Sequence, residues 1–212
     1  MAPQGNRRPG RPFASKAGET RQQIIQAARL VFGERGYDGA TFQAIAARAG
    51  LSRPALNHHF SSKRALYRKV LDDTNKAVLG VGIRQAEGET TLVARMTAFI
   101  SAGITADSEN STGSLFLVTG VLESQRHPDL VGTENDSVRI AREFLTRVVN
   151  DAIECGEVAA DIDAPALVEA LLVLCCGIGL YAGYVESDQR MLTLIDIVRQ
   201  LLAGALATHP RR

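Results

Sequence analysis

The chain has 212 residues, a formal net charge of +1, 45% hydrophobic residues and 22% charged residues. These proportions are ordinary for a folded protein and exclude a disordered, collagen-like or disulfide-rich chain. The charge is distributed unevenly. Residues 1–70 contain 13 Lys and Arg against three Asp and Glu, whereas residues 71–212 contain 11 against 20. A basic front third indicates that this part alone meets an anionic polymer or surface.

Residues 1–17 contain three Pro, two Gly, four basic residues and no acidic residue, which predicts a flexible basic arm. Its segment 8–12 reads Arg-Pro-Gly-Arg-Pro and resembles the core of an AT-hook. In that interpretation Arg8 and Arg11 lie along a narrow minor groove of DNA. The hook usually has Arg where Pro9 stands, and a basic tail without groove preference fits the sequence equally well.

Four helices are expected next, from the spacing of apolar residues and from capping residues. They cover residues 19–35, residues 42–49, a short segment from Arg53, and a longer segment from Lys63 with an apolar stripe to Val78. The expected N-caps are Thr41, Ser52 and either Ser61 or Ser62. Gly36 and Gly50 end the first two helices, because glycine tolerates positive φ.

The remainder of the chain also predicts helices and shows no strand-like alternation. The expected ranges are 91–106, 112–125, 130–155, 164–185 and 189–207. The helix at 164–185, capped by Asp163, is apolar nearly all round, which predicts burial on several sides. Its uncharged run of 16 residues, 170–185, is shorter than the roughly 20 needed to span a bilayer, so no membrane contact is expected.

Residues 42–61 form the pattern that carries the function. Two short helices meet at Gly50, Ala46 lies where they cross, and Ile45 and Leu56 point into a shared core. This is the arrangement of a helix-turn-helix, whose second helix enters a major groove of DNA. Any pair of antiparallel helices would show a similar spacing, but the basic charge of the same region favours DNA.

The same region carries a family resemblance. It rests on Thr20-Arg21, Ala27-Ala28, Phe32, Gly36-Tyr37, Thr41, Ile45-Ala46, Ala49-Gly50-Leu51-Ser52, Leu56, His58-His59-Phe60, Ser62-Lys63 and Ala65-Leu66. Across about residues 19–70 the chain resembles the tetracycline-repressor (TetR) family. The resemblance implies a homodimeric transcriptional regulator, usually a repressor, that binds double-stranded operator DNA. It also implies a C-terminal domain that binds a small effector and releases the DNA.

The resemblance also implies roles for single residues. The positions that meet base edges are Gln43, Arg53, Pro54 and Ala55, and those that meet phosphates are Thr41, His58, His59 and Lys63. The chemistry agrees, because Arg suits guanine, Gln suits adenine and an Ala methyl suits thymine. Asn57 stands where the family usually has Tyr, and we expect it to read adenine. As alternatives, either histidine could be a packing or solvated residue, and Arg64 and Arg68 an ordinary solvated face.

The C-terminal helices 164–185 and 189–207 look like the dimer-forming pair of that family. The expected interface residues are Leu171, Leu174, Ile178, Leu194, Val198 and Leu201. The expected effector pocket is lined by Met96, Phe99, Phe116, Phe144, Cys175 and Tyr181. For each of these six, the sequence favours a plain core residue over a pocket residue. Their aliphatic and aromatic character predicts an apolar or amphipathic effector.

The predicted fold is all-α with about nine helices. Its parts are the arm at 1–17, a helix-turn-helix DNA-binding domain at 18–65, and an effector-binding and dimerisation domain at 66–212. The chain has three cysteines, an odd number that favours free thiols in a reducing compartment over disulfides. The N-terminus lacks the apolar segment of a signal peptide, so we expect a cytoplasmic protein.

The leading hypothesis is a ligand-responsive, sequence-specific DNA-binding regulator with a palindromic operator. A nucleoid-architectural DNA binder without effector is the alternative. An enzyme with a basic surface is a third hypothesis, but no phosphate loop, nucleophile–base set or metal-ligand spacing supports it. No catalytic residue, metal or cofactor is therefore expected.

Overall fold

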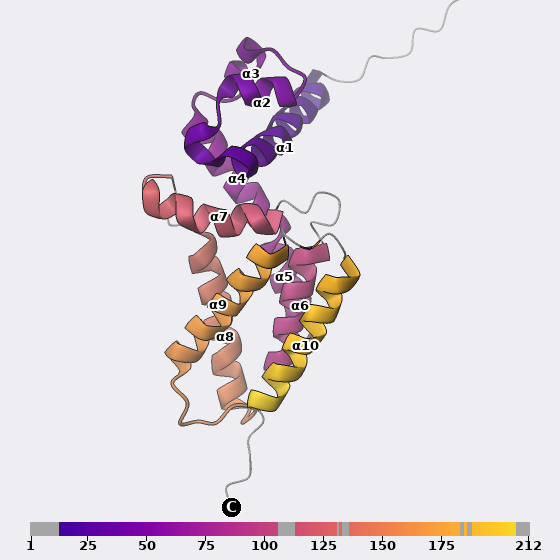
Figure 1. The fold of residues 1–212 in the computed structure, drawn as a ribbon, viewed down its shortest axis with the longest axis vertical. Coiled ribbons are helices and arrows are strands. Elements are labelled where there is room, and N and C mark those ends of the chain that lie inside the picture. Colours follow the sequence, from indigo (N-terminus) through magenta and orange to yellow (C-terminus); the bar gives the residue numbers. More distant parts are fainter. Residues whose placement is uncertain are drawn as a thin grey trace, which may run out of the picture.

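The computed structural model describes residues 13–105, 113–130, 136–182 and 188–206, together with Gly132 and Val185. These residues form an all-helical fold, as predicted, with ten helices (Figure 1). The helices are α1 (Phe13–Gly39), α2 (Phe42–Arg48), α3 (Arg53–His59), α4 (Lys63–Ala77), α5 (Leu79–Ala86), α6 (Leu92–Thr105), α7 (Gly113–Arg126), α8 (Ser137–Glu154), α9 (Ala164–Ala182) and α10 (Asp188–Leu206).

The helix boundaries differ from the expectation at three places. Helix α1 begins at Phe13, so residues 13–17 of the expected flexible arm are helical, and Arg8 and Arg11 lie outside the described residues. The helix expected from Lys63 ends at Ala77, and α5 follows it. Val78, with φ −95° and ψ −67°, lies between the two helices. The helix expected from residue 130 begins only at Ser137.

The predicted caps are confirmed by their hydrogen bonds. Thr41 accepts from the backbone N–H of Ala44 at 3.1 Å, and Ser62 accepts from that of Ala65 at 3.1 Å. Ser52 caps α3 through the N–H of Ala55 at 3.3 Å, and Asp163 accepts from Ala166 at 3.0 Å. Each bond satisfies a donor that the first turn of a helix leaves without an intrahelical partner.

The helices are arranged in an upper and a lower lobe (Figure 1). Helices α1 to α3 lie at the upper end, α4 leads down from them, and α5, α6, α8, α9 and α10 form the lower bundle. The upper hydrophobic core includes Leu66 and Leu71 of α4, and also Phe116 and Leu117 of α7. The expected domain boundary between residues 65 and 66 therefore falls inside α4, whose first turns pack with the upper lobe.

Helix α9 is buried on one side only, contrary to the expectation of burial on several sides. Leu171 and Ile178 face the lower core, but Val173 is 70% exposed and Tyr181 is 51% exposed. The reason is that α7 and α8 pack against one face of α9, while its other face has no comparable cover within the described residues. By length and apolar composition α9 could cross a bilayer, a property that core helices of soluble proteins share.

Gly36 should carry a measurable part of the stability of the upper lobe. Its φ of +66° and ψ of 177° are a combination that essentially only glycine adopts, and an added Cβ would lie 2.8 Å from Glu123 Oε1, so Gly36→Ala should lower the free energy of unfolding by about 1–3 kcal/mol. Gly33→Ala is the matched control, because an added Cβ there meets open space. It should raise stability by about 0.5–1 kcal/mol, since Ala favours a helix over Gly. Urea unfolding followed by circular dichroism measures both, and equal effects would contradict the assignment.

Candidate nucleic-acid interface and ligand pocket

The α2–α3 unit is held by a tight turn and by small buried side chains. Gly50 has φ +63°, and the N–H of Leu51 donates to the Ala46 carbonyl at 2.9 Å. Ile45, Ala46 and Leu56 are at most 2% exposed, so the two helices cross in close contact. This packing fixes the inner faces of α2 and α3 and leaves the outer face of α3 free to meet another molecule.

The outer face of α3 presents most of the residues expected to contact DNA. Arg53, Pro54, Asn57 and His58 are exposed, whereas Ala55 and His59 are half-buried. Gln43 and Thr41, which begin α2, are exposed as well. Figure 1 shows α3 at the end of the upper lobe farthest from the lower bundle. The structure thus gathers these residues where a large partner can approach them.

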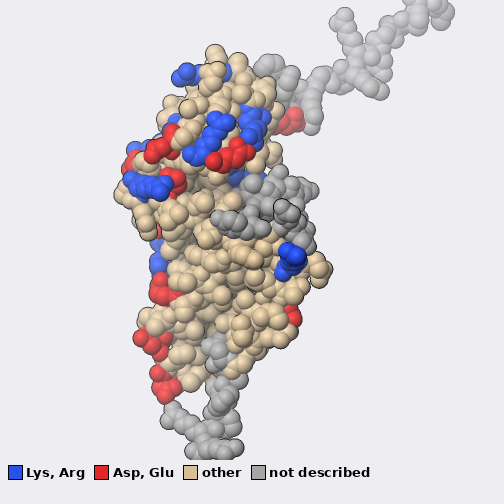
Figure 2. All heavy atoms as spheres, in the orientation of Figure 1, with Lys and Arg blue, Asp and Glu red and all other residues tan. Residues whose placement is uncertain are grey.

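Arg53 differs from Arg48, another cation of the upper lobe. It is exposed and makes no hydrogen bond or ion pair to any described residue. Arg48, in contrast, donates to both carboxylate oxygens of Glu34, at 2.9 and 2.8 Å. Lys and Arg side chains gather over the upper lobe in Figure 2. Among them, the Arg53 guanidinium, at the start of α3, is free for bidentate contact with a base edge.

Lys63 is not placed as expected. Its ammonium donates to the carbonyls of Tyr37, Ala40 and Asp38, at 2.8, 3.1 and 3.4 Å. It also lies 4.4 Å from the centre of the Tyr37 ring. Because an ammonium has three donors, and three carbonyls take them, no donor of Lys63 is left for a phosphate in this structure, and Lys63 joins the start of α4 to the end of α1.

Arg64 and Arg68 bind the turn that follows α7 and are not a merely solvated face. Arg64 pairs with the Asp129 carboxylate at 3.1 Å, and Arg68 donates to the Leu130 carbonyl at 3.1 Å. His127 Nε2 lies 3.0 Å from Asp38 Oδ2. Sequence reasoning missed this contact between lobes. The only local sequence signal is Pro128, which indicates that a helix ends nearby but does not indicate which residues the following turn contacts.

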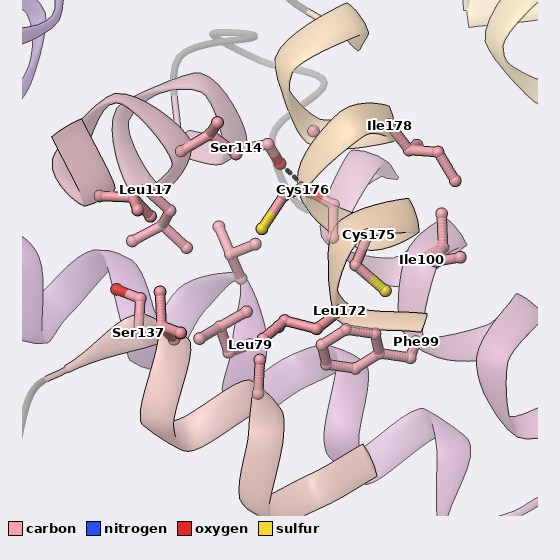
Figure 3. A pocket seen from close by; sticks show the side chains of 17 residues that line it. Leu79, Phe99, Ile100, Ser114, Leu117, Ser137, Leu172, Cys175, Cys176 and Ile178 are labelled. Carbon is pink, nitrogen blue, oxygen red and sulfur yellow. Dashed lines mark hydrogen bonds between the residues drawn. The ribbon is translucent and has the colours of Figure 1, made fainter. Parts of the chain in front are cut away.

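A pocket with a cavity volume of about 90 Å³ lies between the lower helices and α7 (Figure 3). Its wall consists of Val78, Leu79, Phe99, Ile100, Gly103, Ser114, Leu117, Val118, Val121, Ser137, Val138, Ala141, Leu172, Cys175, Cys176, Ile178 and Gly179. None of these side chains is a carboxylate, an amine or a guanidinium, so the described wall is apolar apart from hydroxyls and thiols.

Two of the six expected pocket residues, Phe99 and Cys175, belong to this wall. Met96, Phe116 and Phe144 are core residues, at 0%, 2% and 3% exposure, and Phe144 stacks on Phe99 with ring centres 4.7 Å apart. Tyr181 is half exposed on the outer face of α9. These four lie outside this wall because helical periodicity marks an apolar residue without indicating which neighbouring helix it meets.

The thiols in the wall are uncharged. Burial raises the pKa of Cys175 to about 12, and it also raises the pKa of Cys176. Both thiols therefore stay protonated near neutral pH and act as small apolar groups. No group of three or more His, Cys, Asp and Glu side chains that could hold a metal occurs among the described residues.

The expected dimer residues are divided between core and surface. Leu171 and Ile178 are buried in the subunit's own core, which removes them from any subunit contact, whereas Leu201 is 66% exposed. Leu174, Leu194 and Val198 are half-buried against the lower core. The apolar side chains that remain exposed on α9 and α10 are Val173, Leu180, Tyr181, Leu192, Ile197 and Leu201. We call these six the outer apolar face.

The helix-turn-helix and the exposed outer face of α3 define a DNA-binding protein with a separate apolar pocket. A sequence profile of bacterial regulatory proteins of the tetR family matches residues 24–70. The HTH-type transcriptional regulator UidR of Escherichia coli (strain K12) is 27% identical over 193 residues, which cover 91% of this chain and 95% of that protein. The HTH-type transcriptional activator FasR of Mycolicibacterium smegmatis is 45% identical over 87 residues, 41% of this chain and 38% of its own.

A solved structure, Salmonella enterica GusR, superimposes with a TM-score of 0.66 at 25% identity and covers 89% of this chain and 95% of that one. Residues 24–70 are thus a DNA-binding domain of the tetR family, and the chain resembles regulators with such a domain over about nine-tenths of its length. Regulators of this family bind operator DNA and act as dimers, and they are not enzymes.

Replacing Lys63 should change folding more than it changes the electrostatics of DNA binding. Lys63→Ala removes three charged hydrogen bonds and should lower the free energy of unfolding by about 1–3 kcal/mol. The slope of DNA affinity against salt should stay as in the wild type, since no phosphate contact is lost. Thermal melting and filter binding at several salt concentrations measure the two effects.

Arg64→Ala is the neighbouring control, because its exposed ion pair contributes about 1 kcal/mol at most. An unchanged melting temperature of the Lys63→Ala protein, together with a flatter salt slope, would restore Lys63 to the phosphate contacts.

Proposed function

We propose that this regulator is a ligand-responsive repressor, which reads its operator with α3 and leaves it when an apolar effector fills the pocket. The observation that carries sequence-specific binding is the exposed, unpaired guanidinium of Arg53 at the start of α3. Bound across a promoter, such a protein blocks transcription. It acts without catalysis, in the cytoplasm where the DNA lies.

Base reading is favoured over purely architectural binding by what α3 exposes. Its outer face carries Arg53, Asn57 and Pro54 and no row of lysines. Arg suits guanine and Asn suits adenine, whereas binding without sequence choice relies on cations that meet phosphates. Several other cations of the lobe, such as Arg48 and Lys63, are already held by protein groups. Gln43 and Ala55 add an amide and a methyl for further bases, while Thr41, His58 and His59 flank them as phosphate contacts.

The outer apolar face supports a homodimer. Val173 and Leu201 are 70% and 66% exposed, and burying such side chains against a second copy is favourable by about 25 cal/mol per Å². Figure 2 shows a broad uncharged surface over α9 and α10. A two-fold axis through this face would present two α3 helices to one side of the DNA, which requires an operator with two inverted half-sites.

Effector binding is coupled to DNA by the position of α7. Leu117 and Val121 of α7 line the pocket, and the turn after α7 contacts Asp38 and Arg64 of the upper lobe. A ligand that displaces α7 therefore has a contiguous path to the reading helix. Because the wall carries no charged side chain, the effector is an uncharged or amphipathic molecule whose body is apolar. Effector and operator must then weaken each other reciprocally.

Arg53→Ala should cost about 1–3 kcal/mol per guanine contact on the operator, because the bidentate bond is lost. The loss on unrelated DNA should be smaller, so the specificity ratio falls. The operator is first selected from random DNA with the purified wild-type protein, and affinities are then measured by titration. Arg48→Ala is the matched control, since its partner is Glu34 and its specificity ratio should stay unchanged.

A wild-type protein that selects no sequence would favour the architectural alternative. An equal loss on operator and unrelated DNA in Arg53→Ala would make Arg53 a phosphate contact.

The double substitution Val173→Glu and Leu180→Glu should yield monomers that bind the operator weakly, because two charges would have to be buried without partners. Leu122→Glu is the control: Leu122 is 55% exposed but belongs to α7 and not to α9 or α10. Sedimentation velocity at micromolar concentration distinguishes the species. If the double variant sediments as a dimer, the subunit contact lies elsewhere.

A further inference from the structure

The turn at residues 127–130, which we call the α7 turn, is inserted between the two lobes. Its last residue, Leu130, is 1% exposed and packs in the hydrophobic core of the upper lobe. The turn closes on itself, because the Leu130 N–H donates to the His127 carbonyl at 2.9 Å. It also continues α7, since the His127 N–H donates to the Glu123 carbonyl at 2.8 Å. The α7 turn is therefore a stiff extension of α7.

Two side chains join this turn to the upper lobe, and their contacts fall on two different helices, α4 and α1. Arg68 of α4 donates from Nε to the Leu130 carbonyl at 3.1 Å, and a second nitrogen of its guanidinium donates to the Asp129 carbonyl. His127 contacts Asp38 at the end of α1 at 3.0 Å, and its ring centre lies 5.3 Å from that of Tyr37. Because the contacts fall on two helices, they resist rotation of the lobe as well as its translation.

The other end of α7 faces the pocket. Ser114, Leu117 and Val118 belong to its wall, and Ser114 Oγ donates to the Gly103 carbonyl of α6 at 3.2 Å. One helix thus joins the pocket to the turn that holds the upper lobe. Packed elements of this kind move as units between discrete arrangements.

We infer that the α7 turn sets the angle at which each subunit presents α3 to the DNA, with Arg68 and His127 as the positioning residues. This inference rests on the proposed dimeric operator binding and deepens it. A dimer with rigidly held reading lobes accepts only one separation of its half-sites, because each added base pair both rotates and displaces the second half-site. Loosening the α7 turn should relax that requirement without altering which bases are read.

The test compares operator spacings in the full-length protein. The operator is the sequence selected from random DNA, and its derivatives carry one base pair more or less between the half-sites. The wild type should lose affinity by about tenfold or more on either derivative, since one half-site is then misplaced. In the double variant Arg68→Met and His127→Phe this loss should shrink to about threefold, with the base preference within each half-site unchanged.

Arg95→Met is the matched control. Arg95 also donates to a backbone carbonyl, that of Glu89 at 3.0 Å, and to an aspartate, Asp151 at 2.6 Å, but in the lower lobe. The Arg95→Met protein should lose as much affinity as the wild type when the spacing of the half-sites is changed. His127→Phe alone keeps the ring against Tyr37 and serves as the milder variant should the double variant melt early. It should show a smaller relaxation of the same sign.

Three results would be decisive against parts of this scheme. An unchanged spacing penalty in a folded Arg68→Met and His127→Phe protein, or in His127→Phe alone, overturns the role of the α7 turn. Relaxation in Arg95→Met to the same degree also overturns it, because general softening would then explain the effect. A wild type that binds a single half-site as tightly as the full operator refutes the proposed dimeric binding itself, and the inference fails with it.

Discussion

The arrangement of the helices in the upper lobe depends on one ammonium group, which donates hydrogen bonds to the carbonyls at the end of α1. Gly36 takes a positive φ there, and the chain leaves the helix with carbonyls that need donors. Lys63 supplies them to Tyr37, Asp38 and Ala40, and its charge lies over the Tyr37 ring. The start of α4 is thereby fixed against the end of α1, and the α2–α3 unit is held between these two helices.

The Tyr37 ring extends this constraint toward the lower bundle. Its centre lies 5.3 Å from the centre of the Tyr67 ring, and the centre of the Tyr67 ring lies 5.6 Å from that of Phe116 of α7. Burial, more than any other factor, raises the pKa of Tyr67, which therefore stays neutral in this apolar stack. Together with Leu130, the stack joins the upper core to α7 by apolar contact. The hydrogen bonds of Arg68 and His127 fix the orientation of the two parts. The proposed coupling between the pocket and the DNA can run through these packed groups, without any further element of the fold.

The basic charge of residues 1–70 serves two purposes that composition alone cannot separate. Lys63 and Arg68 are structural, because backbone carbonyls take their donors. Lys69 is paired along α4 with Asp73, and Arg48 with Glu34. Arg53, like Arg35, makes no hydrogen bond or ion pair to the described residues. The electrostatic attraction that brings the lobe to DNA is shared by all these cations, but selection between sequences falls to the few side chains on the outer face of α3.

The sequence by itself determined the local structure and the class of protein. Hydrophobic spacing and the residues Thr41, Ser52 and Gly50 predicted the helix-turn-helix, because caps and turns depend on atoms within a few residues of one another. The charge of the front third and the pattern of α2 and α3 predicted DNA as the partner, and the exposed position of Arg53 on α3 fits the predicted role.

What only the tertiary structure decided is which distant group each side chain meets. Lys63 carried the same sequence signal as a phosphate ligand, yet it binds carbonyls of residues 23 to 26 positions earlier in the chain. Leu171 and Val173 read alike as apolar residues of one helix, but 2% of the first and 70% of the second is exposed. Spacing along a helix defines a face. The fold of the rest of the chain determines whether that face meets the core, a pocket, a second subunit or water.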